Sequence, residues 1–388
     1  MLFLYYIIVV IVWFFAAPFI FLLSFAKVKY KNSLKARFFL YRNIKQQLAA
    51  VHFHICSLGE AKSIEKLVLC FDSRVSTITQ TGFDYACMFC KKVNFLAFEP
   101  FLPFWLKPCK VLVLFEAEYW LMLVFCAKVK GAKVILVNAR ITEKSYKNYK
   151  RFAFFYRKVF FYIDEVFAQS EKDKERLLEL GAKNVHVFCN IKASLEPKLT
   201  RKLQKLCSKL ILFANTHNNE EELLLKNISL LENEKLLIAP RHPERFVEVK
   251  ELLSSKGIGF STVSDFSFDN GIEELFKNQI VLLDVLGELV NFYSISDVVV
   301  LGGSFVKGIG GHNPVEAAFF KNSIISGKYI DNQKTLFSQV ENIIFCENIQ
   351  EFDELVHRQN NQAIVKQKKD LQPIIQAIQK GVYAGKSL

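Results

Sequence analysis

Several motifs that mark well-known chemistries are missing from this sequence. No Walker A sequence with its Lys-Ser/Thr pair occurs, and no glycines have the GxGxxG spacing of dinucleotide-binding proteins. The chain also lacks a close His, Asp and Glu cluster at metal-ligand spacing and a Ser-His-Asp arrangement. These absences argue against a P-loop nucleotidase, a metalloenzyme and a serine hydrolase. Among enzymes, they leave a transferase that needs no metal and no cofactor.

The cysteines lack the pattern of a disulfide framework. There are nine, an odd number, scattered through apolar stretches, which suits reduced, buried thiols in a cytosolic protein. Cys87 and Cys90 form a CxxC pair, but no second CxxC or paired-His motif accompanies it. A zinc or redox role for this pair is therefore disfavoured.

Charged side chains are absent from residues 2–26, a stretch long enough to cross a membrane, since about 20 apolar residues suffice. The stretch has neither the basic start nor the short apolar region of a signal peptide. Seven Lys and Arg follow before the first acidic residue, Glu60, and this bias places the rest of the chain in the cytoplasm. We expect residues 1–27 to anchor the protein at the cytoplasmic face of the inner (plasma) membrane, by spanning it or by lying in its interface.

The size and charge of the chain limit its organisation and partners. At 388 residues it is too long for one ordinary core, so two domains are expected. The net charge of +13 indicates an anionic partner, which could be nucleic acid, an anionic membrane face or a phosphorylated substrate.

Apolar runs ending in polar residues alternate with helix-like stretches such as 60–70 and 171–180, which favours parallel sheets. The predicted strands are 50–58, 110–118, 132–140 and 164–170, then 209–216, 235–243, 279–284 and 297–304. The polar stretch 190–203 is a linker between them. The pattern predicts an α/β fold with two Rossmann-like, doubly wound domains facing a cleft. The domains comprise residues 28–195 and 196–388, and the last helix of the chain can pack back on the first domain. Ligands should bind beyond the carboxyl ends of the strands.

In the first half, polar residues follow three predicted strands. Glu60 begins a helix after the tight turn at Gly59. The helix dipole alone would account for an acid there, but a carboxylate at a strand end can also act as a general base. Glu116 and Glu118 form an acidic pair on one side of the end of the next strand. Asn138 and the cation Arg140, which suits a carboxylate or phosphate, end the third.

In the second half, Arg241 and His242 follow a strand where it should open into the cleft, whereas Arg245 fits a solvated surface position. Five of the 16 glycines lie within residues 302–311, which suggests backbone cleared for a closely bound ligand. A helix should then start at Pro314 after an Asn313 cap, and its free amides suit a phosphate. Glu316, in the first turns, could accept hydrogen bonds from a ribose.

These features together resemble the Kdo transferase family, the membrane-associated enzymes that transfer 3-deoxy-D-manno-oct-2-ulosonic acid (Kdo) from CMP-Kdo to the lipid A precursor. The resemblance runs in order along nearly the whole chain. It rests on the apolar amino terminus and on the motifs SLGEAKS, FEAEYW, VNARIT, AQSEKDKERLLELGAKNV, PRHPERF, LGELVNFYSISDVVVLGGSF and GGHNPVEAA. PRHPERF and GGHNP are each moderately specific, and the ordered set is stronger evidence.

The resemblance implies a B-type glycosyltransferase (GT-B) fold and an inverting transfer that needs no metal. It implies that Glu60 is the general base on the acceptor hydroxyl and that the first domain binds the acceptor, lipid IVA, with Glu116, Asn138 and Arg140 in the cleft. The second domain would bind CMP-Kdo. The matching donor residues are Arg241, His242, Gly287, Glu288, Leu289, Gly310, Gly311, His312, Asn313 and Glu316. The anionic cytoplasmic membrane face is then a partner, and nucleic acid is not.

The chain departs from the family pattern in three places. Residues 215–221, NTHNNEE, lack the usual glycine; Leu121 stands where proline is common; and the loop at 302–314 is one residue longer. Residues 144–158 interleave six cations with aromatics and are either a lipid or acceptor surface or a solvated helix.

Three other interpretations compete with a Kdo transferase. One is a GT-B enzyme that uses another nucleotide sugar, such as a UDP-sugar. Another is a membrane-tethered nucleic-acid-binding protein, whose cations should line one groove. The third is an inactive scaffold that keeps the fold.

Overall fold

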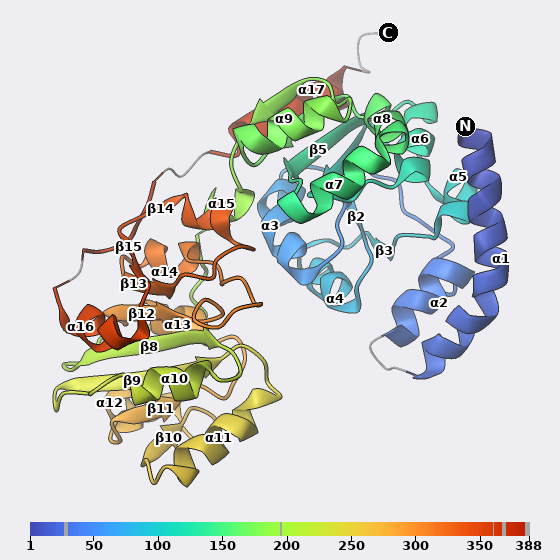
Figure 1. The fold of residues 1–388 in the computed structure, drawn as a ribbon. Coiled ribbons are helices and arrows are strands. Elements are labelled where there is room, and N and C mark those ends of the chain that lie inside the picture. The colour runs from blue at the N-terminus through green and yellow to red at the C-terminus, as the bar shows by residue number, and fades with distance from the viewer. Residues whose placement is uncertain (27–29, 195, 360, 367–369, 385–388) are drawn as a thin grey trace. The chain divides into compact units, whose positions relative to one another are not determined.

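The computed structural model describes residues 1–26, 30–194, 196–359, 361–366 and 370–384 (Figure 1). The chain forms two compact units, Met1–Lys192 with Lys369–Leu388, and Ala193–Lys368. We call them the first and the second unit. The first unit's main segment ends at Lys192, inside the polar stretch 190–203.

The first unit begins with two helices, α1 (Leu2–Ala26) and α2 (Lys31–Phe39). α1 is apolar and long enough to cross a membrane, and only 6% of its most apolar window is buried. One side of α1 nevertheless contacts the unit: Tyr6 Oη donates to the Pro100 carbonyl at 2.9 Å, Trp13 Nε1 donates to the Phe38 carbonyl at 3.0 Å, and Tyr5 hydrogen-bonds Glu99. α1 therefore lies along the unit beside α2, as Figure 1 shows.

A parallel seven-stranded sheet forms the centre of the first unit, in the order β3-β2-β1-β4-β5-β6-β7. Its strands are β1 (Val51–His54), β2 (Ser73–Thr77), β3 (Val93–Phe95), β4 (Val111–Phe115), β5 (Lys133–Ala139), β6 (Glu165–Ala168) and β7 (Val185–Val187). Its helices are α3 (Leu58–Leu69), α4 (Gln80–Phe89), α5 (Leu102–Trp105), α6 (Leu121–Val129), α7 (Glu143–Arg151), α8 (Ala153–Phe161) and α9 (Glu171–Glu179). Strands buried on both faces read as continuous apolar runs, as β4 does.

The last helix, α17 (Gln372–Tyr383), belongs to the first unit, although the second unit precedes it in the chain. It packs against β4 and β5. Lys133 Nζ donates to the Ala377 carbonyl at 3.3 Å, and a Cβ on Gly381 would lie 2.6 Å from Val111. A glycine is needed there because the helix backbone closely approaches the sheet.

The second unit repeats this architecture with a seven-stranded parallel sheet, in the order β10-β11-β9-β8-β12-β13-β15. Its strands are β8 (Lys209–Thr216), β9 (Glu234–Pro240), β10 (Phe260–Thr262), β11 (Ile280–Leu282), β12 (Val298–Leu301), β13 (Ser323–Gly327) and β15 (Ile343–Cys346); β14 (Val340–Glu341) and β16 (Ile364–Val365) form an antiparallel pair. Its helices are α10 (Glu220–Lys226), α11 (Arg245–Ser255), α12 (Ile272–Leu275), α13 (Leu289–Tyr293), α14 (Val315–Phe319), α15 (Lys334–Phe337) and α16 (Phe352–His357). The predicted α/β fold with two Rossmann-like sheets is confirmed.

Both sheets reverse their strand order at one point, between β1 and β4 in the first unit and between β8 and β12 in the second. Ligands of doubly wound folds bind at such a switch point, beyond the carboxyl ends of the strands. His54 pairs with Leu114 in register, so the segments after β1 and β4 leave the sheet side by side. The residues after these strands are thus the first to examine for function.

Candidate active site

Glu60 lies at the first turn of α3, directly beyond β1. Ser57 caps this helix, with its Oγ 3.4 Å from the Glu60 amide nitrogen. The Glu60 carboxylate points back over the helix start: Oε2 accepts from the Cys56 amide at 2.7 Å, and Oε1 accepts from Ser57 Oγ at 3.0 Å. This arrangement is a variant of the capping box: Ser57 accepts from the Glu60 amide, and the Glu60 carboxylate accepts from the amide one residue before the cap, at Cys56. The side chain is therefore held rigidly.

The pKa of Glu60 is nevertheless raised, to about 7. Burial is the largest cause, since only 9% of the residue is exposed, and the negative charges of Glu116 and Glu118 add to it. The hydrogen bonds from Cys56 and Ser57 act in the opposite direction. An acid that served only the helix dipole would stay fully ionised. Glu60 can instead exchange a proton near neutral pH, as a general base requires.

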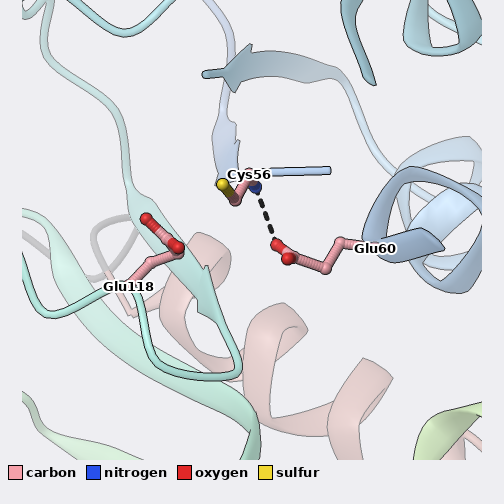
Figure 2. Close-up of side chains that lie close together, drawn as sticks. All are labelled: Cys56, Glu60 and Glu118. Atoms are coloured by element: carbon pink, nitrogen blue, oxygen red, sulfur yellow. Dashed lines mark hydrogen bonds between the residues drawn. The ribbon is translucent and has the colours of Figure 1, made fainter. Parts of the chain in front are cut away.

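Glu118 is the second carboxylate of this cluster. Figure 2 shows Cys56, Glu60 and Glu118 pointing toward one another, and one ligand atom of each lies within 4.8 Å of the others. Burial would raise the pKa of Glu118, but contact with His54, the indole N–H of Trp120 at 2.6 Å and the charge of Arg37 together lower it. Glu118 is thus the ionised partner of a protonatable Glu60.

The Cys56 thiol lies between these two acids. Burial and the charges of Glu118 and Glu60 raise its pKa to about 12. The thiol is therefore protonated at neutral pH and is no nucleophile as it stands.

Two buried histidines of β1 lie behind Glu118 and are linked to each other through Ser76. His54 Nε2 lies 3.5 Å from Glu118 Oε2, and His54 Nδ1 contacts the carbonyl and hydroxyl oxygens of Ser76 at 3.1 and 3.0 Å. His52 Nε2 contacts the same hydroxyl at 2.8 Å. Both imidazoles are fully buried, so they fix the position of Glu118 from inside the sheet.

Glu116 and Asn138 form a separate pair beside this cluster. Asn138 Nδ2 donates to Glu116 Oε1 at 3.1 Å, and Lys192 Nζ lies 3.8 Å from the same oxygen. Both residues have left-handed backbone, with φ of 54° and 55°. This conformation is costly for side-chain-bearing residues and is concentrated at functional sites. Arg140 follows, half-buried, just beyond β5.

In the second unit, the PRHPERF segment differs from the prediction at one residue. Arg241 and His242 are exposed beyond β9, as a ligand-binding pair needs to be. The expectation that Arg245 is a solvated surface residue is wrong. Its side chain is 13% exposed, and Nη2 pairs at 3.0 Å with Glu221, which is 1% exposed. A buried carboxylate needs such a partner.

Gly303 and Gly310 of the glycine-rich loop are required by the protein's own packing. A Cβ on Gly303 would lie 2.8 Å from the His312 ring, and one on Gly310 would lie 2.5 Å from Asn332. Both have positive φ, 69° and 91°. We expected the glycines to let the backbone approach a bound ligand closely, and for Gly303 and Gly310 this expectation must be corrected. At these two positions the missing side chain gives room to neighbours in the same unit, and glycine permits the left-handed turns.

Glu220, which the sequence analysis did not single out, holds this loop. Its carboxylate is fully buried and accepts from the amides of Gly303 at 2.7 Å, Phe305 at 2.9 Å and His217 at 2.9 Å. A carboxylate that accepts several amide hydrogens is a strong local brace. It ties the ends of β8 and β12 together at the switch point.

His312, which follows this loop, stacks on His217, which follows β8, with their Nε2 atoms 2.7 Å apart. Burial, then the charges of His217, Arg241 and His242, lower the pKa of His312 to about 3, so it is neutral. One ring must then donate and the other accept. His312 thus offers no positive charge to a phosphate.

The remaining predicted donor residues lie at two short helix starts. Helix α14 begins at Val315, one residue later than predicted, with Pro314 at its N-cap position, and Asn313 Oδ1 accepts from the Val315 amide at 3.0 Å. α14 has only five residues, and Glu316 is exposed at its first turn. Gly287 has φ 94°, and Glu288 pairs with Arg201 and Asn291 at 3.0 and 2.7 Å before Leu289 opens α13.

The structure thus places the predicted first-unit residues together near the switch point of the first sheet. It places the predicted second-unit residues beyond the carboxyl ends of the strands of the second sheet. Sequence reasoning missed Arg37, His54, Cys56 and Lys192. His54 and Cys56 precede Glu60 closely, but they lie in an apolar run that marks no function. Arg37 on α2 and Lys192 after β7 are brought to the site only by the fold.

The two Rossmann-like sheets place the chain in the GT-B structural class. A solved relative of this fold is UDP-GlcNAc 2-epimerase from Methanocaldococcus jannaschii, with TM-score 0.56 and 13% identity, covering 85% of this chain and 99% of that chain. At this identity the likeness shows the fold alone.

Sequence comparisons then identify the family. The family profile described as 3-deoxy-D-manno-octulosonic-acid transferase (kdotransferase) matches residues 32–195. The 3-deoxy-D-manno-octulosonic acid transferase of Haemophilus influenzae is 29% identical over 82% of this chain and 80% of its own length. A bifunctional glycosyltransferase/methyltransferase of Fusobacterium nucleatum is 30% identical over 80% of this chain, which spans only 53% of that protein. The chain belongs to the Kdo transferase family, a family of glycosyltransferases.

Proposed function

We propose that this chain transfers Kdo from CMP-Kdo to the lipid A precursor lipid IVA, with inversion at the anomeric carbon and without a metal, in lipopolysaccharide biosynthesis. The observation that carries the proposal is the carboxylate of Glu60. It is buried at the switch point of the first unit, is held by two hydrogen bonds and has a pKa near 7. Family membership supplies the reaction class.

The proposed step uses Glu60 as general base. The carboxylate takes the proton of the acceptor hydroxyl while the hydroxyl oxygen bonds to the anomeric carbon of Kdo. The bond between that carbon and the phosphate oxygen breaks, and CMP leaves with the electron pair. A positioned base contributes about 10²–10⁴-fold to such a step. Attack opposite the leaving phosphate inverts the anomeric centre.

We assign the donor to the second unit. Arg241 is exposed beyond β9 and can neutralise the phosphate of CMP without competing with a buried acid, since Arg245 already pairs with Glu221. His242 lies next to it, with its ring 5.4 Å from that of His217. Because Glu220 braces the glycine-rich loop, its amides are oriented before the donor arrives, and such preorganised dipoles stabilise a leaving phosphate.

We assign the acceptor to the first unit. Glu116 and Asn138 hold each other at 3.1 Å, and both are fixed by left-handed backbone. They can orient an acceptor hydroxyl beside Glu60. Lys192 and Arg140 supply positive charge for an acceptor phosphate.

We place the protein at the cytoplasmic face of the inner membrane, held by α1. The face of α1 that does not contact the unit exposes Phe14, Phe15 and Phe19, at 67–70%. Contacts at Tyr6 and Trp13 tie the opposite face to the unit. A helix held along its length in this way fits the membrane interface better than a free span.

The test is incubation of the purified full-length chain with lipid IVA and either CMP-Kdo or UDP-GlcNAc, with the lipid products analysed by mass spectrometry. We expect a Kdo–lipid product from CMP-Kdo alone, and an undiminished rate after a chelator is added. A sugar–lipid product only from UDP-GlcNAc would mean another nucleotide sugar is the donor. No product from either donor would contradict the proposal, and a rate lost to the chelator would contradict its metal-free part.

Glu60→Gln tests the base, and Glu171→Gln is its matched control. Glu171 is also an acid in the first turn of a first-unit helix, but its side chain is 74% exposed and forms an ion pair with Lys174 at 3.7 Å. The first variant should lose about 10²–10⁴-fold in rate, and the control should keep the wild-type rate. Full activity in Glu60→Gln would mean that another group is the base.

A further inference from the structure

The cluster of Cys56, Glu60 and Glu118 combines ligand types that the proposed transfer does not need together. The reaction uses one carboxylate as a base, whereas the site also presents a thiol and a second acid (Figure 2). One ligand atom from each side chain lies within 4.8 Å of the others. In a tetrahedral site with bonds of about 2.0–2.3 Å the ligand atoms are about 3.5 Å apart. Small side-chain rotations would close the difference.

His54 supplies an independent sign of a ligand. It is fully buried, and among the described residues its Nε2 has no hydrogen-bond partner, although it lies 3.5 Å from Glu118 Oε2. In the tautomer in which Nδ1 donates to the Ser76 carbonyl, the Nε2 lone pair faces the carboxylate. Two electron-rich atoms then face each other in a buried place. The contact is favourable when Nε2 carries a hydrogen, the case that lowers the pKa of Glu118, and in this other tautomer a cation held by Glu118 would satisfy both atoms.

The ligand set selects the kind of ion. Thiolate, imidazole and carboxylate together are the ligands of zinc, whereas magnesium and calcium prefer oxygen alone. The charges also balance. The thiolate of Cys56 and the carboxylates of Glu60 and Glu118 carry three negative charges, which a divalent cation and the nearby Arg37 neutralise. Binding displaces the thiol proton to solvent.

We propose that Cys56, Glu60 and Glu118, with Nε2 of His54 beside them, bind Zn²⁺ or a similar thiophilic divalent cation, and that this ion inhibits the protein by occupying Glu60. The inhibition rests on the proposed function of Glu60 as the base. The metal site itself does not, because it follows from the geometry of the four side chains.

The metal site is tested first, with Co²⁺ as a spectroscopic probe of the full-length chain. Exposed Cys70, Cys87 and Cys207 are replaced with serine so that they cannot bind metal. We expect one Co²⁺ per chain with a thiolate-to-cobalt charge-transfer band, displaced by Zn²⁺. Cys56→Ala should abolish the band, and Glu118→Gln should weaken Co²⁺ binding at least about 10-fold, because removing even a hydrogen-bond partner of a metal ligand costs about 10–100-fold in affinity.

Glu116→Gln is the matched control, since Glu116 lies two residues from Glu118 but outside the cluster. It should keep the band. No charge-transfer band in the parent protein, or a band unchanged by Cys56→Ala, would overturn the site. If Cys56→Ala fails to fold, as judged by circular dichroism, Glu118→Gln against Glu116→Gln decides the question.

The inhibition is tested next, as Kdo transfer against Zn²⁺ concentration, each variant being normalised to its own metal-free rate. Zn²⁺ should inhibit the parent protein, and Cys56→Ala should need at least about 10-fold more Zn²⁺ for the same loss. Equal sensitivity in both would overturn the inhibitory role. If the parent protein shows no transfer without metal, the proposed function fails, while the cobalt band still decides the metal site.

Discussion

Replacing Glu60 with glutamine should stabilise the first unit while it removes the activity. Burial raises the pKa of Glu60 from 4.5 to about 7. The folded protein therefore binds this proton more tightly than the unfolded chain does. From about pH 4.5 to 7 the unfolded state releases the proton first, so the free energy of unfolding falls as pH rises. Below that range Glu60 is protonated in both the folded and the unfolded state, so its burial does not lower the free energy of unfolding by this route.

The magnitude follows from the two pKa values. At about 1.4 kcal/mol per pKa unit, the rise from 4.5 to about 7 corresponds to a cost of up to about 3 kcal/mol above pH 7. Glutamine is never charged, and its amide can still accept from Cys56 and donate to Ser57. We therefore expect Glu60→Gln to raise the free energy of unfolding at pH 8 by about 1–3 kcal/mol, and by little at pH 4.5.

The assay is denaturant unfolding followed by tryptophan fluorescence. Trp13, Trp105 and Trp120, the three tryptophans of the chain, are all in the first unit. The control Glu171→Gln should lower stability by about 0.3–1 kcal/mol or leave it unchanged, because it removes an exposed acid from a helix start. A Glu60→Gln variant that is less stable than wild type at pH 8, or a difference that does not grow with pH, would refute the reasoning.

Three further predictions concern pH, the second unit and the membrane. With a chelator present, kcat/KM should rise with pH and level off above about 7, where Glu60 is ionised; a pH-independent rate would argue against it as base. Arg245→Ala should destabilise the second unit by about 3 kcal/mol, measured by hydrogen exchange, because Glu221 loses its buried partner. Exposed Arg241→Ala should leave stability within about 0.5 kcal/mol but raise the KM for CMP-Kdo; equal destabilisation by both would contradict this assignment. Phe15→Glu with Phe19→Glu should weaken flotation with anionic vesicles at least about 10²-fold, since each buried Phe contributes about 1.5–3 kcal/mol; exposed Val247→Glu in the second unit is the control, and unchanged flotation of the double variant would exclude α1 as the anchor.

The sequence predicted the strands that are continuous apolar runs. Residues 209–216 form β8 over the predicted range, and 110–118 contain β4. β2 was not predicted, because Ser73–Thr77 reads as a polar segment. It is nevertheless buried, since the Nη1 and Nη2 atoms of Arg74 donate to the carbonyls of Lys107, Pro108 and Gln47. A strand whose polar groups are paired by distant segments leaves no local hydrophobic pattern.

Only part of the site could be predicted, because its other residues also depend on contacts between distant segments. Glu60 and Glu116 follow strand ends and Asn138 is the next-to-last residue of β5, and that position alone marks them. The approach of Cys56 to Glu118 depends on β1 lying next to β4 rather than β3, which is a property of strand order. Arg245 was misplaced because its partner Glu221 lies 24 residues away, on α10. Long-range partners decide which charges are buried, and one sequence does not show them.

The most direct test of the account compares Kdo transfer from CMP-Kdo to lipid IVA by the wild-type chain and by Glu60→Gln, under single-turnover conditions with chelator present. The account predicts a Kdo–lipid product from the wild type and a rate about 10²–10⁴-fold lower from the variant, which remains folded. A folded Glu60→Gln protein that transfers Kdo at the wild-type rate would contradict it.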